Sequence, residues 1–226
     1  DCISYGEKHR KSSPAWAKRA FEAVLALDPK NEKAVAAVKE LIDVQRAGGG
    51  FGLPEFLIKR DSMSGWDGAE YSSRWTCKGR TITGDQRSPG IICYRSGVFL
   101  RKTYRLTVRA RVVERYSADW YWGLMFGTDA NAPKMYSFGY GYQQDVYLVR
   151  NAGTNMKDLW SKPKTHWDPK EWHILRVDVT PDKVTCYADG EEVFSHGAEL
   201  ARDFEGTMGL NIRGARVEFT DLKVYR

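Results

Sequence analysis

The sequence predicts a mainly β protein, an antiparallel jelly-roll sandwich preceded by a short α-helical hairpin. Helical periodicity is confined to the residues before Gly50. From Phe51 onward, short runs rich in Val, Ile, Tyr, Phe and Trp are separated by Gly, Asp, Asn and Pro, which is the composition of strands and turns. About ten such runs without an intervening helix are typical of a sandwich or jelly roll.

The chain begins with two predicted helices. Ser13 and Pro14 form a start signal, because a hydroxyl caps free N–H groups and proline lacks the N–H that would go unpaired there. Apolar residues follow at spacings of three and four until Pro29, and Asn31 can cap a second helix of the same kind. The predicted organisation is a helical hairpin at residues 1–47, a Gly-rich linker at 48–52 and the jelly roll at 53–226.

Strand periodicity is clearest in three stretches. Along Arg105–Val113 the apolar residues alternate with Arg and Thr, and His173–Val179 and Tyr136–Tyr142 also alternate. Such one-sided strands are typical of antiparallel sheets that bury one face. We therefore expect a sandwich with an apolar core.

An Asp-Gly pair between two strand-like runs predicts a tight hairpin. Asp189 and Gly190 separate Thr185–Ala188 from Glu192–Ser195. Asp-Gly suits the positive φ angles of a two-residue turn of the primed type. A β-branched residue at position 190 would resist that conformation.

The composition places the chain among globular proteins. Of its 226 residues, 42% are hydrophobic and 13% are aromatic, which allows a substantial core. No apolar run approaches the ~18 residues of a membrane-spanning helix, so we expect no membrane insertion. The net charge of +6 is spread thinly, unlike the basic tracks that bind nucleic acid. Because the chain starts at Asp1 without a signal-peptide core, we expect a processed product or a piece of a longer protein.

The four cysteines do not have the spacing of a zinc site, so no metal cluster is expected. Cys77 and Cys93 fall on runs that the pattern places on neighbouring strands. They would form a disulfide in an oxidising compartment or stay buried thiols in a reducing one, and both interpretations remain open.

No cofactor is predicted, apart from a structural calcium ion for which Asp129, Asn131 and Asp182 offer oxygens without EF-hand spacing. Catalytic residues stay unknown. A glycosidase needs two carboxylates on one groove. The carboxylates of the strand-forming runs are isolated from one another: Glu114, Asp119, Asp145, Asp178 and Glu218.

The run Ala17–Val38 resembles the end of a tetratricopeptide repeat. It matches that family's second helix, its corner at Asp28–Asn31, and the first helix of a following repeat. The resemblance implies an upstream helical-repeat domain in the same polypeptide, since a stable array needs about three repeats. The alternative is an unrelated amphipathic helix pair packed on the domain.

A second resemblance rests on six segments with aromatic residues or glycines at fixed places: Ser64–Gly68, Trp75–Gly84, Glu171–Val179, Val184–Phe194, Gly206–Leu210 and Val217–Val224. Their order resembles laminin G-like and concanavalin A-like modules, and also the bacterial 3-keto-disaccharide hydrolase domain family. The resemblance implies a concanavalin A-like jelly roll over nearly all of Phe51–Arg226. At Trp122–Thr128, however, this chain lacks the Asn and Arg that hydrolase-like members tend to carry there.

Aromatic residues crowd one region and suggest a platform for sugar rings. Trp120, Tyr121 and Trp122 lead into a strand, and more Tyr and Phe lie between Tyr136 and Tyr147. Flat rings pack on the apolar faces of sugars, while hydroxyl and indole N–H groups meet the polar edges. We therefore predict ligand contacts at these three residues, with at least one ring substantially exposed. The alternative is that most of the rings fill the core.

Outward-facing residues on other strands form a second candidate ligand-binding set: Arg109, Arg111, Arg176 and Tyr187. Guanidinium groups suit carboxylates, sulfates or paired hydroxyls. The alternative is a solvated sheet face on which these arginines pair with cross-strand carboxylates such as Asp178.

These features favour a non-catalytic module of a larger, bacterial protein that recognises a glycan or another cell-surface polymer. One alternative is a sugar hydrolase of the 3-keto-disaccharide type, and the other is a structural or protein-binding β-sandwich. We expect an extracytoplasmic location, either periplasmic or at the cell surface, and no nucleic-acid partner.

Overall fold

The computed structural model describes residues 2–11, 14–47, 51, 53–58, 60–67, 74–87, 91–100, 103–128, 134–141, 143, 145–152, 155–163, 167–197 and 204–226. The chain divides into two compact units. The helical unit comprises residues 1–57 with 223–226, and the β unit comprises residues 58–222. Each unit is described by itself.

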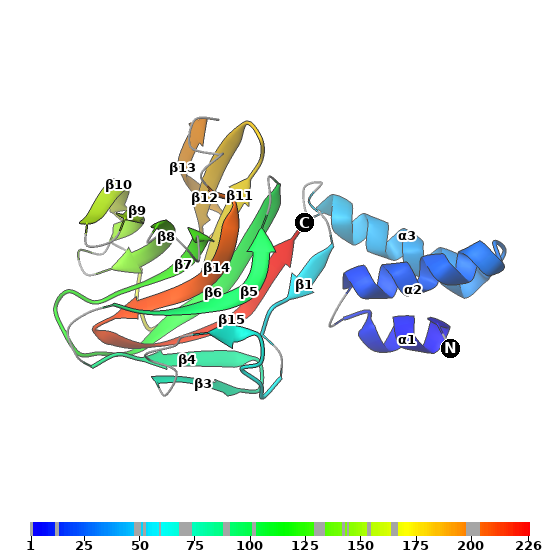
Figure 1. Ribbon diagram of the computed structural model, residues 1–226, viewed down its shortest axis with the longest axis horizontal. Coiled ribbons are helices and arrows are strands. Elements are labelled where there is room, and N and C mark those ends of the chain that lie inside the picture. Colours follow the sequence, from blue (N-terminus) through cyan, green and yellow to red (C-terminus); the bar gives the residue numbers. More distant parts are fainter. Residues whose placement is uncertain are drawn as a thin grey trace. The chain divides into compact units, whose positions relative to one another are not determined.

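The helical unit contains three helices in its described part, α1 (Cys2–His9), α2 (Pro14–Leu27) and α3 (Glu32–Ala47) (Figure 1). Asn31 caps α3, because its Oδ1 accepts the backbone N–H of Ala34 at 3.2 Å. The helix α1 was not predicted, since residues 2–9 lack a regular apolar stripe. Gly6 supplies the contact instead: a Cβ there would lie 2.7 Å from the Phe21 ring, so only a glycine lets the two helices approach.

This unit has its own small core, which also includes one residue from the segment after α3. That residue, Leu53, precedes β1 (Pro54–Phe56), which pairs with residues 223–225 of β15 (Ala215–Tyr225). The buried members of the core are Ala17, Phe21, Ala34, Ala37, Leu41 and Leu53.

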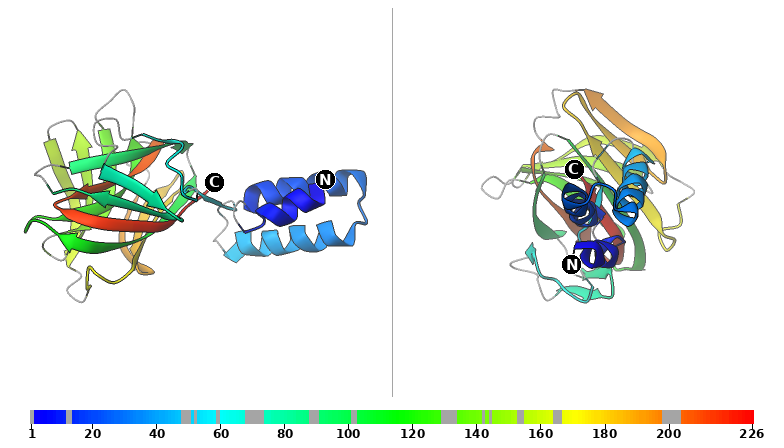
Figure 2. Two further views of the ribbon diagram at one scale, coloured as in Figure 1. Left: turned by 90° about the horizontal axis from the view of Figure 1, so that it is seen from below. Right: turned by 90° about the vertical axis from the view of Figure 1, so that its right-hand side faces the viewer.

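The β unit is an antiparallel sandwich, as the sequence predicted, and Figure 2 shows its two sheets face to face. In the described residues, one sheet has eight strands in the order β13-β12-β11-β6-β15-β4-β3, with β1 also on β15. The other has seven strands in the order β10-β9-β8-β7-β14-β5-β2. The strands not yet bounded are β2 (Trp66–Asp67), β3 (Trp75–Lys78), β4 (Thr81–Asp85), β5 (Ile91–Leu100), β6 (Tyr104–Arg115), β7 (Tyr121–Thr128), β8 (Lys134–Gly141), β9 (Asp145–Ala152), β10 (Asn155–Pro163), β11 (His173–Val179), β12 (Lys183–Ala188), β13 (Glu191–Gly197) and β14 (Gly206–Arg213).

The two sheets differ in how they bury their strands. In the eight-stranded sheet, β6 alternates buried and half-buried residues along most of its length, so one face meets the core and the other meets solvent. In the seven-stranded sheet, consecutive residues are buried from Tyr121 to Gly127 and from Val146 to Val149. Its central strands are therefore covered on both faces, which an ordinary two-layer sandwich does not require.

The cysteine prediction is wrong in one respect. Cys77 lies on β3 of the eight-stranded sheet and Cys93 on β5 of the seven-stranded sheet, so their strands are not neighbours. The thiol of Cys77 donates to the carbonyl of Gly79 at 3.7 Å. The side chain of Cys93 lies outside the described residues.

Helix length and hydropathy bear on membrane insertion. Within the part of the chain that the structure describes, none of the helices combines the length and the apolar character needed to cross a bilayer.

Candidate functional site

The three aromatic residues proposed as a sugar platform are all buried. Trp120 is 3% exposed, Tyr121 8% and Trp122 0%. The prediction that at least one of these rings would be substantially exposed is therefore wrong. Trp122 faces the core, where its ring meets that of Phe219 edge-on at 6.1 Å. Trp120 packs edge-on against Tyr140 at 5.4 Å.

Tyr121 differs from the two tryptophans because it lies on the outer face of the seven-stranded sheet, the face turned away from the core. Its ring passes over three glycines, Gly123, Gly139 and Gly141, which we call the glycine floor. A Cβ at Gly139 would lie 2.7 Å from the Tyr121 hydroxyl, and one at Gly141 would lie 3.1 Å from the ring. The ring can lie flat along the sheet because these positions carry no side chain.

The hydroxyl of Tyr121 begins a buried hydrogen-bonded relay. It lies 2.8 Å from the Ser137 hydroxyl, which in turn donates to Oδ1 of Asn211 at 3.0 Å. Because the proton of Ser137 is used toward Asn211, Tyr121 is the donor to Ser137. The relay joins β7, β8 and β14, and it places three polar side chains directly on the glycine floor.

Sequence reasoning missed Ser137 and Asn211. The signal was present in the alternation of β8, where Ser137, Gly139 and Gly141 share one face while bulky aromatics occupy the other. Small residues opposite large ones suggest that something other than core packing occupies that face. Asn211 gave no comparable signal, because a single Asn in a strand is read first as solvent-exposed.

A second aromatic ring completes this outer face. Tyr121 and Tyr147 meet edge-on with ring centroids 6.3 Å apart, and Val149 joins them in a buried cluster separate from the main core. Tyr147 comes from β9, two strands away from β7. The outer face thus combines two tyrosine rings, a hydroxyl–hydroxyl–amide relay and a floor of glycine backbone, which we call the outer-face site.

Carboxylates are scarce on the four strands that build this site. The strands β7, β8, β9 and β14 contain a single one, Asp145, at the start of β9. Partial burial raises the pKa of Asp145. Burial, together with the negative charges of Asp145 and Asp168, raises the pKa of the neighbouring Tyr140 to about 12. These four strands therefore supply one carboxyl group, not the pair that glycoside hydrolysis requires.

The candidate arginines lie on the opposite side of the sandwich, on the solvent face of the eight-stranded sheet. Arg109 and Arg111 stack over the ring of Trp172 at 5.5 Å and 4.8 Å. Arg111 hydrogen-bonds to Glu218 at 2.9 Å, while Arg109 lies 3.6 Å from Asp221. Both guanidinium groups are thus matched by carboxylates of the same face.

Arg176 and Tyr187 form a second stacked pair on that face. The guanidinium lies 3.5 Å from the centroid of the Tyr187 ring, and its Nε lies 3.5 Å from Asp178. Asp178 is also held by a two-pronged ion pair from Arg105 at 2.6 Å and 2.7 Å. The structure brings the four predicted residues onto one sheet face, where each has an aromatic or carboxylate partner within the protein.

The residues considered for calcium are not brought together. Asp129 and Asn131 lie outside the described residues, and Asp182 is exposed in the turn before β12. Among the side chains that the structure describes, no group of three His, Cys, Asp or Glu residues is placed to hold a metal ion.

The two antiparallel sheets form a jelly-roll β-sandwich. Residues 59–225 match the 3-keto-alpha-glucoside-1,2-lyase-like domain family, and the chain belongs to that family. No protein with a curated description matches the chain by sequence. The N-terminal helices lie outside the matched residues.

Solved structures share this fold at low sequence identity. A carbohydrate-binding module, CBM66 from Bacillus subtilis, is 19% identical with a TM-score of 0.59, covering 73% of this chain and 98% of that one. A putative glycosyl hydrolase from Parabacteroides distasonis is 14% identical with a TM-score of 0.56, covering 80% and 96%. An endo-beta-1,3-glucanase from Pyrococcus furiosus is 11% identical with a TM-score of 0.57, covering 77% and 93%. At these identities the likeness concerns the fold.

Proposed function

We propose that the β unit is a glycan-recognition module whose ligand binds at the outer-face site of the seven-stranded sheet. The observation that carries this proposal is the difference between the two sheets. The eight-stranded sheet presents an ordinary solvated face, whereas the outer face of the seven-stranded sheet holds a polar relay and two tyrosine rings on a glycine floor. Packing of the sandwich core does not require this arrangement of polar groups and rings on the outer face.

The chemistry of the outer-face site suits a sugar. Tyr121 and Tyr147 are 8% and 6% exposed, and Ser137 and Asn211 are buried next to Tyr121. Rings pack on the apolar faces of sugars, while hydroxyl and amide groups exchange hydrogen bonds with sugar hydroxyls. A ligand would contact the rings first and reach the relay at its Tyr121 end. The carbohydrate-binding module among the similar structures supports a ligand of this class.

Recognition is favoured over glycoside hydrolysis by the carboxylate count. Acid–base hydrolysis of a glycoside uses two carboxyl groups about 5 to 10 Å apart. The four strands that build the outer-face site supply Asp145 alone. This chain also lacks the Asn and Arg of the hydrolase-like stretch at Trp122–Thr128.

A second candidate function is glycoside cleavage, which one observation favours. Burial raises the pKa of Asp145. A carboxyl group that stays protonated to a higher pH is suited to donate a proton to a leaving oxygen. If the protein cleaves the glycan that it binds, incubation should release a new reducing end, and Asp145→Asn should abolish that release while binding persists. Intact ligand after prolonged incubation with the wild-type protein would support recognition alone.

The binding proposal is tested with a glycan array followed by calorimetric titration of the best ligand. We expect dissociation constants between micromolar and millimolar, which correspond to about −4 to −8 kcal/mol. Tyr121→Phe removes one hydroxyl and keeps the ring, so it should weaken binding about tenfold, the effect of one lost hydrogen bond of about 1.4 kcal/mol. Thermal unfolding of the variant shows whether the sandwich stays intact.

The matched control is Arg176→Ala, because Arg176 lies on the opposite sheet face. Its guanidinium stacks on Tyr187 and is remote from the relay. Binding should be unchanged in this variant. Loss of binding in Arg176→Ala with normal binding in Tyr121→Phe would move the site to the eight-stranded sheet. If no glycan binds to the wild-type protein, the structural role is the better account.

A further inference from the structure

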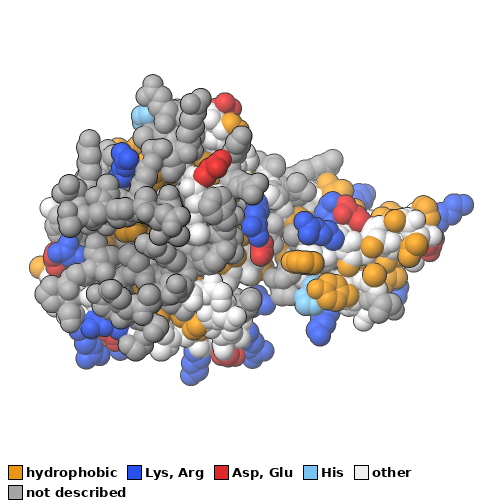
Figure 3. Space-filling view, in the orientation of Figure 1, with side chains coloured by type: hydrophobic (Ala, Val, Ile, Leu, Met, Phe, Trp, Pro, Cys, Tyr) orange, Lys and Arg blue, Asp and Glu red, His pale blue; other side chains and the backbone are white. Residues whose placement is uncertain are grey.

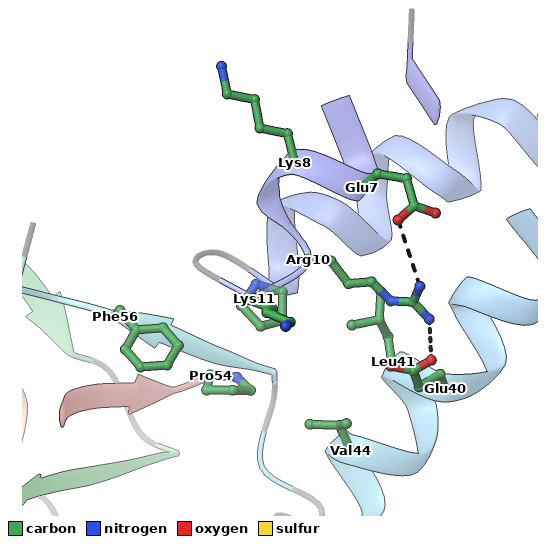
Figure 4. Close-up of a pocket in the computed structure, with 10 residues that line it drawn as sticks. Glu7, Lys8, Arg10, Lys11, Glu40, Leu41, Val44, Pro54 and Phe56 are labelled. Carbon is green, nitrogen blue, oxygen red and sulfur yellow. Dashed lines mark hydrogen bonds and ion pairs between the residues drawn. The ribbon is translucent and has the colours of Figure 1, made fainter. Parts of the chain in front are cut away.

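A cavity of about 500 Å³ lies within the helical unit (Figure 4). It is formed by the end of α1, the start of α2, the second half of α3 and strand β1. It lies outside the residues that match the lyase-like domain family, and it is separate from the outer-face site. Its lining residues are Glu7, Lys8, Arg10, Lys11, Pro14, Glu40, Leu41, Val44, Pro54 and Phe56.

One side of the cavity is apolar. Leu41 and Val44 come from α3, and Pro54 and Phe56 come from β1 (Figure 4). Val44 is 41% exposed, so this apolar surface is only partly covered by the rest of the protein. The volume lies within the range of ligand-binding pockets, and it is large enough for one or two bulky side chains.

The charged side of the cavity has an excess of positive charge. Arg10 lies between Glu7, at 3.9 Å, and Glu40, and Figure 4 shows its guanidinium bridging the two carboxylates. The carboxylates of the cavity are thus already engaged. Among the described side chains, neither Lys8 nor Lys11 lies within ion-pair distance of a carboxylate.

The two lysines differ in whether another interaction within the protein offsets their charge. Lys8 lies in the last turn of α1, where a cation favourably offsets the helix dipole, and Figure 4 shows it directed away from the Arg10 ion pairs. Lys11 lies beyond the end of the helix, so the helix dipole stabilises its charge only weakly. Lys11 is therefore the unmatched cation that the cavity offers to a ligand.

Exposed apolar side chains gather on the same unit. In Figure 3 they appear in orange over the helices. Of the large hydrophobic residues that the structure describes as exposed, Ile174 lies in the β unit and the others lie on the helices: Tyr5, Trp16, Leu27, Val35 and Val44. Of these residues, Val44 lines the cavity. Exposed apolar surface of this kind is typical of sites that contact another macromolecule.

A second cavity of the same unit repeats the chemistry. Its volume is about 510 Å³, and its lining includes the exposed ring of Trp16 beside Arg19, whose guanidinium lies 5.6 Å from that ring. Arg226 is paired with the one carboxylate of this cavity, Glu55. Here too the unmatched charge is a cation next to an apolar surface.

We propose that the helical unit binds an acidic peptide segment of a partner protein, which inserts an aliphatic or aromatic side chain against Val44 and Phe56 and places a carboxylate on Lys11. Charge complementarity selects this occupant, because both cavities offer unmatched cations and engaged carboxylates. The β unit thus carries the proposed glycan site, and the helical unit carries a separate protein-binding site.

The test uses the full chain and a peptide array. Each probe has a two-residue apolar core, drawn from Leu, Ile, Phe and Trp, flanked on both sides by paired Asp or Glu. The same cores flanked by Ser and by Lys are printed beside them. We expect binding to acid-flanked cores alone, with affinity that falls as salt is raised. Lys11→Glu should weaken binding to the best peptide at least tenfold in fluorescence anisotropy.

The matched control is Lys33→Glu, which makes the same charge change on an exposed position of α3 outside the cavity. It should leave peptide binding unchanged. Val44→Ser supplies a second variant, because Val44 is half-exposed and its replacement weakens the apolar contact without removing a core residue. Circular dichroism confirms that each variant keeps its helices. No preference for acid-flanked cores, or equal binding by Lys11→Glu and Lys33→Glu, would overturn the proposal.

Discussion

At the scale of single residues, the glycines of β7 and β8 explain why the outer face of the seven-stranded sheet can hold a tyrosine flat. A Cβ at Gly139 would lie 2.0 Å from the carbonyl oxygen of Trp122 and 2.7 Å from Cα of Gly123. Both are backbone atoms of the neighbouring strand, so they cannot move aside as a flexible side chain could. The close approach of these strands therefore depends on glycine.

The first prediction concerns this contact. Gly139→Ala should destabilise the protein by about 1–3 kcal/mol, the range seen when extra atoms are forced into a packed interior. Gly197→Ala is the control, because a Cβ at Gly197 meets open space and its φ is not positive. Urea unfolding monitored by tryptophan fluorescence gives both values. Equal stability of the two variants would show that β7 and β8 are less closely packed than the structure indicates.

His173 is the residue whose protonation the surroundings determine most clearly. Its Nδ1 lies 2.8 Å from a carboxylate oxygen of Asp189, and its Nε2 lies 2.7 Å from the carbonyl oxygen of Asp168. Both partners are acceptors, so both bonds form only when the ring carries two protons. The ring of Trp167, stacked at 4.0 Å, also favours the cation. Burial lowers the pKa of His173, but these hydrogen bonds outweigh it and the net pKa is raised.

The second prediction follows from that direction. A raised pKa in the folded state means that His173 contributes stability that is fully present below its unfolded pKa of about 6.5 and is lost as the pH rises through the folded value. Asp189→Asn keeps an oxygen for the backbone N–H of Ile174 but removes the charge, so the pKa should fall. NMR titration of the His173 ring protons measures it, with the exposed His196 as internal reference. The same pKa in both proteins would contradict the assignment.

At the scale of elements, the Asp-Gly hairpin was predicted correctly from local residues. Ala188 pairs with Glu191 across the turn, and Asp189 and Gly190 have φ angles of 49° and 85°. Positive φ at both positions defines the primed two-residue turn that the sequence predicted. Asp189 further stabilises the turn by accepting the N–H of Ile174 at 2.7 Å.

The third prediction tests that turn. Gly190→Val should destabilise the protein by about 1 kcal/mol or more, since a β-branched residue resists a positive φ. A Cβ at Gly190 meets no atom within 4 Å, so the cost is conformational and not steric. The control is Gly197→Val, at an open position on the same hairpin whose φ is not positive. An unchanged melting temperature for Gly190→Val would mean that the turn tolerates other conformations.

Sequence reasoning succeeded where the signal is local and failed where it depends on distant residues. Turns and strands were predicted because their signals are local, as in Asp189-Gly190 and the alternation of β6. Burial of Tyr121 could not be read in this way, because β7 is covered on both faces and its alternation assigns no face to solvent. The pairing of Arg105 with Asp178 joins residues far apart in the chain, and it depends on the register of β6 with β11. Such partners follow from topology, which the sequence pattern did not provide.

At the scale of the whole molecule, each unit has its own core. The β unit buries large rings from both sheets, among them Tyr104, Trp122, Phe138 and Phe219. The core of the helical unit is much smaller and consists mostly of Ala and Leu side chains around Phe21. A core of that size stabilises a short chain weakly. We therefore expect the β unit to fold without the helices, and the helical unit to be unstable when isolated.

The fourth prediction expresses this inequality. A variant without residues 1–47 keeps β1, its pairing with β15 and the entire core of the β unit. Its melting temperature should therefore lie within about 4 °C of the full chain, equivalent to ~1 kcal/mol for a domain of this size, and its circular dichroism should lose only the helical signal. The complementary fragment 1–57 should show little helix by itself, because its three helices share a single large buried ring, that of Phe21. A shortened protein that unfolds or aggregates at room temperature would show instead that the helices are an integral part of the sandwich fold.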